Sequence, residues 1–286
     1  MKYRAETVLV TTDCVSDLTV ELLEKYQIPV MHYYVQTQEA RFQDNTEISS
    51  DGLIEYIEVD GKKAYSSCAS EEEYRKFFEK QKKNSNRKII HICMAKHDSD
   101  AYATASKAAQ EMEDVYVVDS GHLSGGMGIM VITAADMAKR GAPCEVILEE
   151  MERLRMKVSS SFVVNSTECL YRNGKIGSRI HNICESLTLH PIIKLKDSHM
   201  CLAGICVGSP QRSARAYLRR MLRDKKEIVP DMVFLITAGC TYEFQQFLKQ
   251  EMEERVPWKK IYVNVASATI SCNCGSGAFG VLFVRK

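Results

Sequence analysis

The chain has 286 residues, of which 45% are hydrophobic and 26% charged, and its 38 Lys and Arg nearly balance its 37 Asp and Glu. The resulting net charge of +1 argues against a surface dedicated to nucleic acid. The composition is that of a folded chain rather than a disordered one. At about 150 residues per domain, the length predicts two domains.

The N-terminus lacks the apolar region of a secretory signal, and no segment reaches the roughly 18 consecutive apolar residues of a membrane-spanning helix. The 11 cysteines form an odd set without a C-x-x-C pair. This pattern favours reduced thiols over disulfides or a zinc site. We therefore expect a cytoplasmic protein that holds no metal.

Strand-like and helix-like segments alternate through the first half, which is typical of a parallel sheet covered by helices on both faces. The expected strands are 8–13, 28–36, 87–94 and 115–120, and the expected helices are 17–26, 51–58, 100–112, 125–141 and one that begins at 71. Suitable helix caps are Ser16 or Asp17, Ser49 or Ser50, and Ser70. We expect an α/β/α domain over residues 1–155.

The pattern changes after about residue 155, and residues 156–286 predict a mixed-sheet α/β domain. Two strands within 191–208 are expected to pair as a hairpin that turns around Asp197 and Ser198. The other expected strands are 160–166, 232–239, 259–269 and 278–286, and the expected helices are 167–187 with a break near Gly174 and Gly177, 213–226 and 242–255. The sequence therefore predicts a two-domain α/β fold.

Two carboxylates end predicted strands, Asp13 after the first and Asp119, beside Ser120, after a later one. Open α/β sheets bind ligands at such strand ends, so a hydrolase or phosphotransferase that uses Asp13 and Asp119 is one hypothesis. The alternative is that these carboxylates cap or brace the helix that follows. The sequence has neither a metal-ligand spacing nor a Ser/His/Asp or Cys/His set.

Two further segments offer groups for an anion. Ser66 and Ser67 precede the helix that Ser70 caps, where hydroxyl and backbone N–H groups suit a carboxylate or phosphate, or belong to an ordinary turn. Lys96 follows a predicted strand and could hold an anion, whereas His91 alternates within that strand and is expected to be interior. These residues leave a binding site and a purely structural role open.

Two further patterns are weaker evidence for a functional site. The segment 275–280 matches G-x-G-x-x-G, but the residues after it predict a strand instead of the helix that a dinucleotide site requires, so we expect no cofactor. A predicted helix carries a run of arginines, which favours either a solvated face or a docking surface for an acidic partner. These arginines are Arg212, Arg215, Arg219, Arg220 and Arg223.

Taken in order, several segments resemble motifs of the DegV family of bacterial fatty-acid-binding proteins, from about residue 8 to 284. Thr-Thr-Asp-Cys-Val-Ser-Asp-Leu at 11–18 is similar to that family's Thr-Asp-Ser-x-x-Asp-Leu, and Gly-Ser-Gly-Ala-Phe-Gly at 275–280 to its Gly-Pro-Gly-Ala-Leu-Gly. The other matching segments are 42–44, 66–70, 119–128, 170–176 and 189–193.

The resemblance implies a protein that holds one long-chain fatty acid in an apolar tunnel between its two domains. It also implies that the bound carboxylate is presented to a separate ATP-dependent fatty acid kinase, a step of phospholipid metabolism, while the carrier itself performs no chemistry. The positions that the resemblance assigns to the carboxylate are Ser66, Ser67, Lys96, Asn273 and Gly275, with Asp13 and Ser120 as support and Arg212 for docking the kinase.

The chain departs from the family's pattern at several of these positions. Ser66 replaces a Thr, Ala95 and Lys96 replace two Ser, Asn273 replaces a His, and Lys175 replaces an Arg. Because Asn donates hydrogen bonds and Lys strengthens the retention of a carboxylate, we expect the same ligand in a rebuilt head-group site. A lipid-sensing regulatory module without a kinase partner is the remaining alternative.

Overall fold

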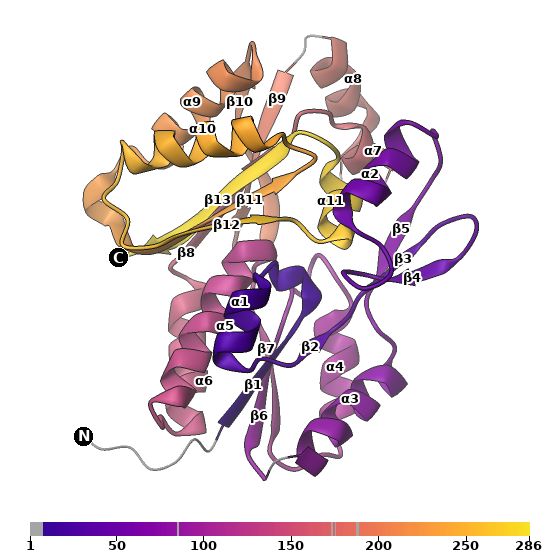
Figure 1. The fold of residues 1–286 in the computed structure, drawn as a ribbon, viewed down its shortest axis with the longest axis vertical. Coiled ribbons are helices and arrows are strands. Elements are labelled where there is room, and N and C mark those ends of the chain that lie inside the picture. Colours follow the sequence, from indigo (N-terminus) through magenta and orange to yellow (C-terminus); the bar gives the residue numbers. More distant parts are fainter. Residues whose placement is uncertain (1–7, 85, 173, 175, 187–188) are drawn as a thin grey trace.

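The computed structural model describes residues 8–84, 86–172, 174, 176–186 and 189–286. Two α/β parts lie end to end along its long axis, with a four-stranded sheet in the lower part of Figure 1 and a six-stranded sheet in the upper part. This arrangement confirms the predicted fold class. Among the described residues, no helix combines the length and apolar character needed to cross a membrane.

The lower part is built on a parallel sheet of strand order β2-β1-β6-β7. Its strands are β1 (Val8–Asp13), β2 (Val30–Met31), β6 (Lys88–Cys93) and β7 (Val115–Asp119), and a short 3-10 turn, η1 (Cys14–Ser16), follows β1. Its helices are α1 (Val20–Tyr26), α3 (Glu71–Asn84), α4 (Ala101–Ala109), α5 (Ser124–Lys139) and α6 (Cys144–Arg155). Helices α5 and α6 lie on one side of the sheet and α3 and α4 on the other (Figure 1), which explains why every residue of β1 is buried.

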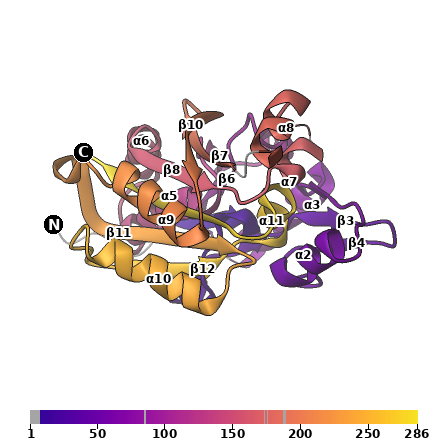
Figure 2. The same ribbon diagram turned by 90° about the horizontal axis from the view of Figure 1, so that it is seen from above.

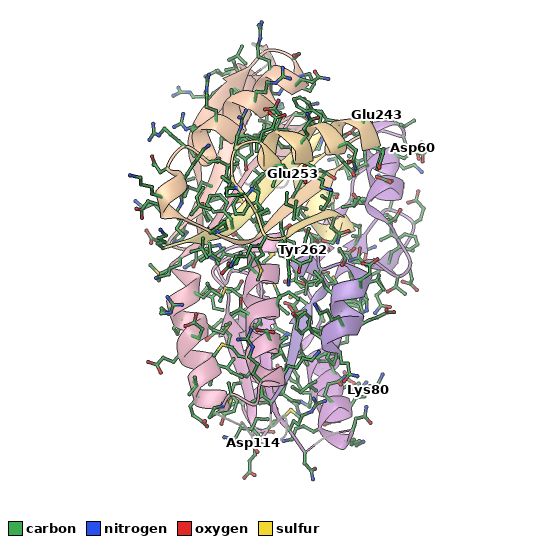
Figure 3. All side chains as sticks on the ribbon, turned by 60° about the vertical axis from the view of Figure 1, so that its left-hand side comes forward. Asp60, Lys80, Asp114, Glu243, Glu253 and Tyr262 are labelled. Carbon is green, nitrogen blue, oxygen red and sulfur yellow. The ribbon has the colours of Figure 1, made fainter. Side chains whose placement is uncertain are left out.

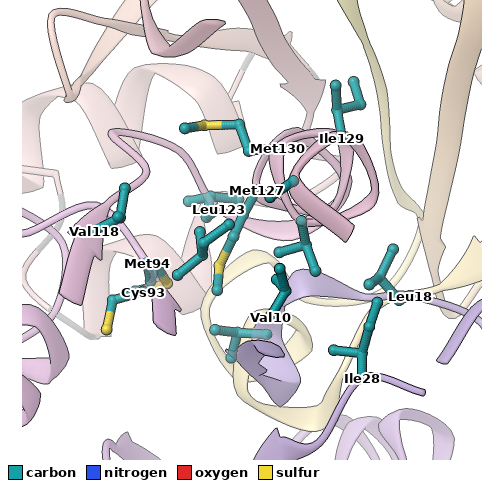
Figure 4. Close-up of a cluster of buried hydrophobic side chains, with 14 of the residues drawn as sticks. Val10, Leu18, Ile28, Cys93, Met94, Val118, Leu123, Met127, Ile129 and Met130 are labelled. Atoms are coloured by element: carbon teal, nitrogen blue, oxygen red, sulfur yellow. The ribbon is translucent and has the colours of Figure 1, made fainter. Parts of the chain in front are cut away.

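Helix α5 is buried along most of its length, because it packs against β1 below and the mixed sheet above. Leu123, which precedes α5, and its residues Met127, Ile129 and Met130 join side chains of the parallel sheet in the cluster of Figure 4. A Cβ on Gly125 would lie 2.6 Å from the Phe234 Cβ, so the glycine lets α5 approach the upper sheet closely. The glycine-rich segment therefore joins the two parts.

The upper part is a six-stranded sheet of order β10-β9-β8-β13-β11-β12, in which only the β11–β12 pair is parallel. Its strands are β8 (Val158–Val163), β9 (Leu189–Lys196), β10 (His199–Val207), β11 (Ile228–Ala238), β12 (Ile261–Val265) and β13 (Ala278–Arg285). The helices are α7 (Glu168–Arg172), α8 (Ser178–Ser186), α9 (Pro210–Met221), α10 (Tyr242–Glu253) and α11 (Ala268–Cys274), with a 3-10 turn, η2 (Lys225–Glu227).

Alternate residues of β11 face opposite sides of the mixed sheet. Val233 and Leu235 pack with α9 and α10, which Figure 2 shows from above, whereas Phe234 and Ile236 join the core that contains α5. This alternation follows from the period of two in a strand. Charged side chains such as Lys80 and Glu243 point outward from both parts (Figure 3).

A third, antiparallel sheet of order β4-β3-β5 was not predicted. Its strands are β3 (Tyr34–Gln36), β4 (Arg41–Gln43) and β5 (Tyr65–Ser67), and α2 (Ser50–Glu58) lies between β4 and β5. The single strand expected at 28–36 is wrong, because the chain changes sheets at His32 and Tyr33, where Tyr33 N–H donates to Cys14 Sγ at 3.2 Å. This small sheet and α2 pack against α11 (Figure 1).

Of the three helix caps predicted above, two are confirmed and one is wrong. Ser49 caps α2 by accepting from Gly52 N–H, and Ser70 accepts from Glu73 N–H at the start of α3, as predicted. The cap of the first helix is Thr19 instead of Ser16 or Asp17. The strand expected at 259–269 is confirmed over Ile261–Val265, but its end is wrong, because α11 begins at Ala268.

The hairpin turn at Asp197 and Ser198 is confirmed, since both residues adopt left-handed backbone angles between β9 and β10. The domain boundary predicted near residue 155 falls between β7, the last strand of the parallel sheet, and β8, the first strand of the mixed sheet. That boundary stays a prediction, because α2 and the small sheet of the first half contact α11 and α7 of the second.

Candidate functional site

A cavity of about 480 Å³ lies between the two parts of the molecule. Its wall takes residues from both halves of the chain, from Tyr33 to Ser124 and from Ser161 to Leu282. The volume falls within the roughly 300–1,000 Å³ typical of small-molecule sites. Large apolar side chains in the wall include Leu123, Phe162, Leu170, Ile236, Phe279 and Leu282. An apolar ligand can be shielded from water in such a space.

Ser66 and Asn273 lie next to each other in the wall of this cavity. Asn273 Nδ2 donates to Ser66 Oγ at 3.3 Å and to the Thr269 carbonyl oxygen at 2.9 Å. Ser66 belongs to β5 and Asn273 to α11, so these residues, 207 positions apart, come together only in the folded chain. Ser67 lines the same cavity. Three of the predicted carboxylate-binding residues therefore share one cavity.

Two threonines in the wall were missed by the sequence analysis. Thr237 and Thr269 line the cavity, and each is at most 2% exposed. The Oγ1 atoms of both are buried and have no hydrogen-bond partner among the described residues. A buried hydroxyl without a partner costs about 1–3 kcal/mol, so a ligand that supplies an acceptor would recover that cost. The sequence carries no signal for them, because both lie in segments that were predicted to be strands, 232–239 and 259–269.

Arg172 of α7 also lines the cavity. Its Nε donates to Glu168 Oε1 at 2.5 Å, while the guanidinium retains further N–H donors. A guanidinium adds the positive charge that hydroxyls and amides lack when they bind an anion. The sequence analysis included Arg172 only as part of a motif.

Asp13 ends β1 as predicted, but its fully buried carboxylate does not line the cavity. Its Oδ1 accepts from the Tyr74 hydroxyl at 2.8 Å and lies 3.2 Å from His91 Nε2, so His91 is the interior histidine that was predicted. Asp13, His91 and Cys93 form a group whose potential metal-ligand atoms lie within 4.8 Å of one another. Burial raises the pKa of the Cys93 thiol well above 9.0, which disfavours the thiolate that metals bind.

Ser120, Gly275 and Lys96 contribute nothing to the wall of the first cavity. Ser120 Oγ donates to the His122 carbonyl at 2.9 Å, and Gly275 ends α11 with a φ of 70°. Lys96 lines a second cavity of about 410 Å³. The structure therefore does not place these three predicted residues in the wall that contains Asn273.

Asp119 braces the loop that follows β7. Its Oδ1 accepts from the backbone N–H groups of Lys96 at 3.2 Å and Gly121 at 2.9 Å, and its Oδ2 lies 3.4 Å from the Arg155 guanidinium. These contacts favour the bracing role over the catalytic one for this carboxylate. Among the described residues, no ion pair involves Arg212, which is exposed on α9. Lys175 lies outside the described residues.

The sequence and fold of this chain are similar to those of known proteins. A family model described as "Uncharacterised protein, DegV family" matches residues 7–286. The chain belongs to the DegV family. A DegV domain-containing protein of Staphylococcus aureus (strain COL) is 26% identical to it over 282 residues, which cover 97% of this chain and 99% of that protein.

Solved structures of other DegV family proteins are similar throughout. A protein from Thermus thermophilus, reported for its fatty acid binding, has 26% sequence identity and a TM-score of 0.89, with coverage of 98% of this chain and 100% of that chain. DegV from Bacillus subtilis, reported as a fatty acid binding protein, has 20% identity and a TM-score of 0.83, with coverage of 99% and 100%. The second likeness shows the fold alone.

In this DegV family chain, two carboxylates from the motif segments 11–18 and 42–44 hold the start of α11. Asp17 Oδ1 accepts from Ser267 N–H at 2.8 Å, and the two oxygens of Asp44 accept from Ala268 N–H at 2.9 Å and Thr269 N–H at 2.8 Å. Carboxylates suit the unpaired N–H groups and positive dipole end of a helix. Asp17 and Asp44 thus position the helix that lines the cavity.

The Asp17 carboxylate of this DegV fold is 2% exposed. Burial raises its pKa from 3.8 to about 7, although the hydrogen bonds from Ser124 and Ser267 act in the opposite direction. Asp17 therefore braces α11 and does not cap α1, the helix that it was expected to cap.

Proposed function

We propose that this protein binds one long-chain fatty acid in the 480 Å³ cavity, with the acyl chain against the apolar wall and the carboxylate beside Ser66, Asn273 and Thr269. The observation that carries the proposal is the pair of buried hydroxyls of Thr237 and Thr269, which have no hydrogen-bond partner in the described part of the chain and lie in an otherwise largely apolar wall. The fatty acid binding reported for the Thermus thermophilus relative supports the ligand class.

The apolar wall accounts for most of the expected affinity. Burial of an acyl chain contributes about 0.8 kcal/mol per methylene, so ten methylenes contribute about 8 kcal/mol before the entropic cost of binding is subtracted. The polar groups then fix the direction of the ligand. Arg172 lies in the same wall and supplies the positive charge, a role that the sequence analysis gave to Lys96.

The protein acts, in this proposal, as a cytoplasmic carrier that performs no chemistry and presents the carboxylate to a fatty acid kinase. Arg212 on the exposed face of α9 is proposed as part of the kinase-docking surface, since its guanidinium is exposed. The strand-end carboxylates Asp13 and Asp119 support an enzyme poorly, because both are at most 6% exposed and engaged with neighbouring groups.

Mass spectrometry tests the ligand directly. The protein as purified is weighed under native conditions and again after organic extraction, and the extract is analysed for fatty acids. We expect a stoichiometric adduct of one long-chain fatty acid. A clean unliganded mass, together with no uptake of oleate or palmitate on incubation, would refute fatty acid binding.

A second candidate is a lipid-sensing regulatory module that has no kinase partner. The two functions differ in what the loaded protein contacts. Capture experiments with lipid-loaded and delipidated protein, followed by an acyl phosphate assay with the captured proteins, separate them. Acyl phosphate formation on the loaded protein supports the carrier, whereas capture of a protein without kinase activity supports the regulator.

A further inference from the structure

A second cavity, of about 410 Å³, lies where loops of the two parts come together. Its wall includes the loops after β6 and β7, the end of α6, the start of β8, the β9–β10 turn and the end of β13. A Cβ on Gly121 would lie 2.6 Å from Ser198 Oγ and 3.0 Å from Arg155 Cδ, so these segments are in close contact. The cavity is therefore built by several elements and is not a gap along one helix.

The wall of this cavity is strongly cationic. Six lysine and arginine side chains line it against a single carboxylate, Asp197. The six are Lys96, Arg155, Lys157, Lys194, Lys196 and Arg285. The chain as a whole has a net charge of only +1, so this concentration of charge is local. Cations held around one concave space repel one another and raise the local concentration of anions.

Most of these charges lack a carboxylate partner. Arg155 pairs with Asp119 at 3.4 Å and with Glu152 at 2.9 Å, but its buried Nε has no partner among the described residues. Lys157 and Lys194 are half-buried, and neither forms an ion pair within the described part of the chain. Partly desolvated cations without counter-charges are costly unless an anion neutralises them.

We propose that this second cavity binds a small molecule that carries two or more phosphate groups. Lysine and arginine are the usual ligands of phosphate oxygens, and arginine binds them through two parallel N–H donors. One phosphate carries a charge of about −2 at most, so a single phosphate leaves most of the six cations unneutralised. The ring of His97 lines the same wall and stacks on His199 at 4.0 Å, which adds a flat surface beside the cations.

The burial of the lysines favours a soluble phosphate compound over an anionic membrane as the ligand of this cavity. Lys96 and Lys196 are exposed at the rim, where a lipid headgroup can reach them, whereas Lys157 and Lys194 are half-buried in the cavity wall. A soluble polyphosphate can contact both pairs. A planar membrane surface contacts the rim pair alone.

Isothermal titration calorimetry with sodium tripolyphosphate at constant ionic strength tests the proposal, with orthophosphate and sulfate as competitors. We expect saturable one-to-one binding that is stronger for tripolyphosphate than for orthophosphate. Because a hydrogen bond to a charged group contributes about 1.5–3 kcal/mol, the variant Lys157→Gln with Lys194→Gln should bind tripolyphosphate at least about tenfold more weakly. Lys226→Gln, an exposed lysine outside the cavity, should bind as the wild type does.

Thermal unfolding without anion shows whether the double variant is folded. If it is not, Lys96→Gln with Lys196→Gln at the exposed rim takes its place, and a weaker loss of tripolyphosphate affinity is expected. Absence of saturable binding, an equal loss in Lys226→Gln, or binding to phosphatidylglycerol vesicles without binding to free tripolyphosphate would each overturn the proposal.

Discussion

The Asp17 carboxylate accepts a hydrogen bond from the Ser267 backbone N–H at 2.8 Å, although 250 positions separate the two residues. Ser267 is the N-cap of α11, the helix that carries Thr269 and Asn273 into the cavity wall. The first turn of the N-terminal half thus determines where a binding helix of the C-terminal half begins.

Stability should depend on pH through Asp17. Its carboxyl has a pKa of about 7 in the folded chain against 3.8 as its ordinary value, so between these pH values the folded state binds a proton that the unfolded state has released. The free energy of unfolding therefore falls as pH rises from about 4 to about 7, by up to about 4 kcal/mol. Asp17→Asn removes this titration.

Urea unfolding at pH 5 and pH 8 measures the effect. From pH 5 to pH 8 the free energy of unfolding of the wild type should fall by about 2–3 kcal/mol more than that of Asp17→Asn. Asp51→Asn, at an exposed carboxylate on α2, is the matched control and should parallel the wild type. Parallel profiles for Asp17→Asn would show that Asp17 does not titrate in this range.

Asp44→Ala should both destabilise the protein and weaken fatty acid binding. It removes the acceptor of two buried backbone N–H groups, those of Ala268 and Thr269, at a cost of about 3 kcal/mol or more. Oleate affinity, measured by calorimetry below the unfolding temperature, should fall because α11 loses its position. Glu55→Ala, at an exposed position of α2, should change stability by less than about 0.5 kcal/mol. Unchanged oleate affinity would show that the position of α11 does not affect oleate binding.

Thr269→Val with Thr237→Val should weaken oleate binding about tenfold or more and should reduce the affinity for methyl oleate less. The reason is that a hydroxyl forms a stronger hydrogen bond to a charged carboxylate than to a neutral ester. The unliganded variant should be at least as stable as the wild type, since two unpartnered buried hydroxyls are removed. Thr133→Val, whose hydroxyl already donates to the Ile129 carbonyl at 2.8 Å, is the control. Equal losses for acid and ester would place the carboxylate elsewhere.

Ser66→Ala and Lys96→Ala should behave differently. Ser66 lies in the cavity wall beside Asn273, so its loss should reduce affinity for oleate more than for the methyl ester. Lys96 lines the second cavity, so Lys96→Ala should leave oleate affinity within about twofold of the wild type. Direct titration of both variants decides the point. A strong loss in Lys96→Ala would restore the role that the motif resemblance assigned to it.

Arg212→Ala should leave the bound lipid content unchanged but reduce acyl phosphate formation in the presence of a fatty acid kinase. Arg219→Ala, an exposed arginine on the same helix, is the matched control for the loss of one charge. Lipid content by mass spectrometry and kinase turnover are measured on the same preparations. Turnover that is equal in both variants would remove Arg212 from the docking surface.

The sequence by itself determined the fold class, because alternating strand and helix periods and the motif resemblance extend along nearly the whole chain. It also indicated Ser66, Ser67 and Asn273, since motif positions are local. It failed at the end of the segment 259–269, where the short helix α11 begins and is stabilised by carboxylates from the other half of the chain. Local propensity contains no information about such distant partners.

Only the tertiary structure decided which residues share a cavity. Lys96 and Asn273 are both polar motif residues, yet Asn273 lines the first cavity and Lys96 the second. Thr237 and Thr269 are ordinary strand and helix residues, but packing buries their hydroxyls with no partner among the residues that the structure describes. A cavity wall is assembled from elements far apart in the chain, and the relative placement of those elements depends on the packing of α5 and α11 between the two parts.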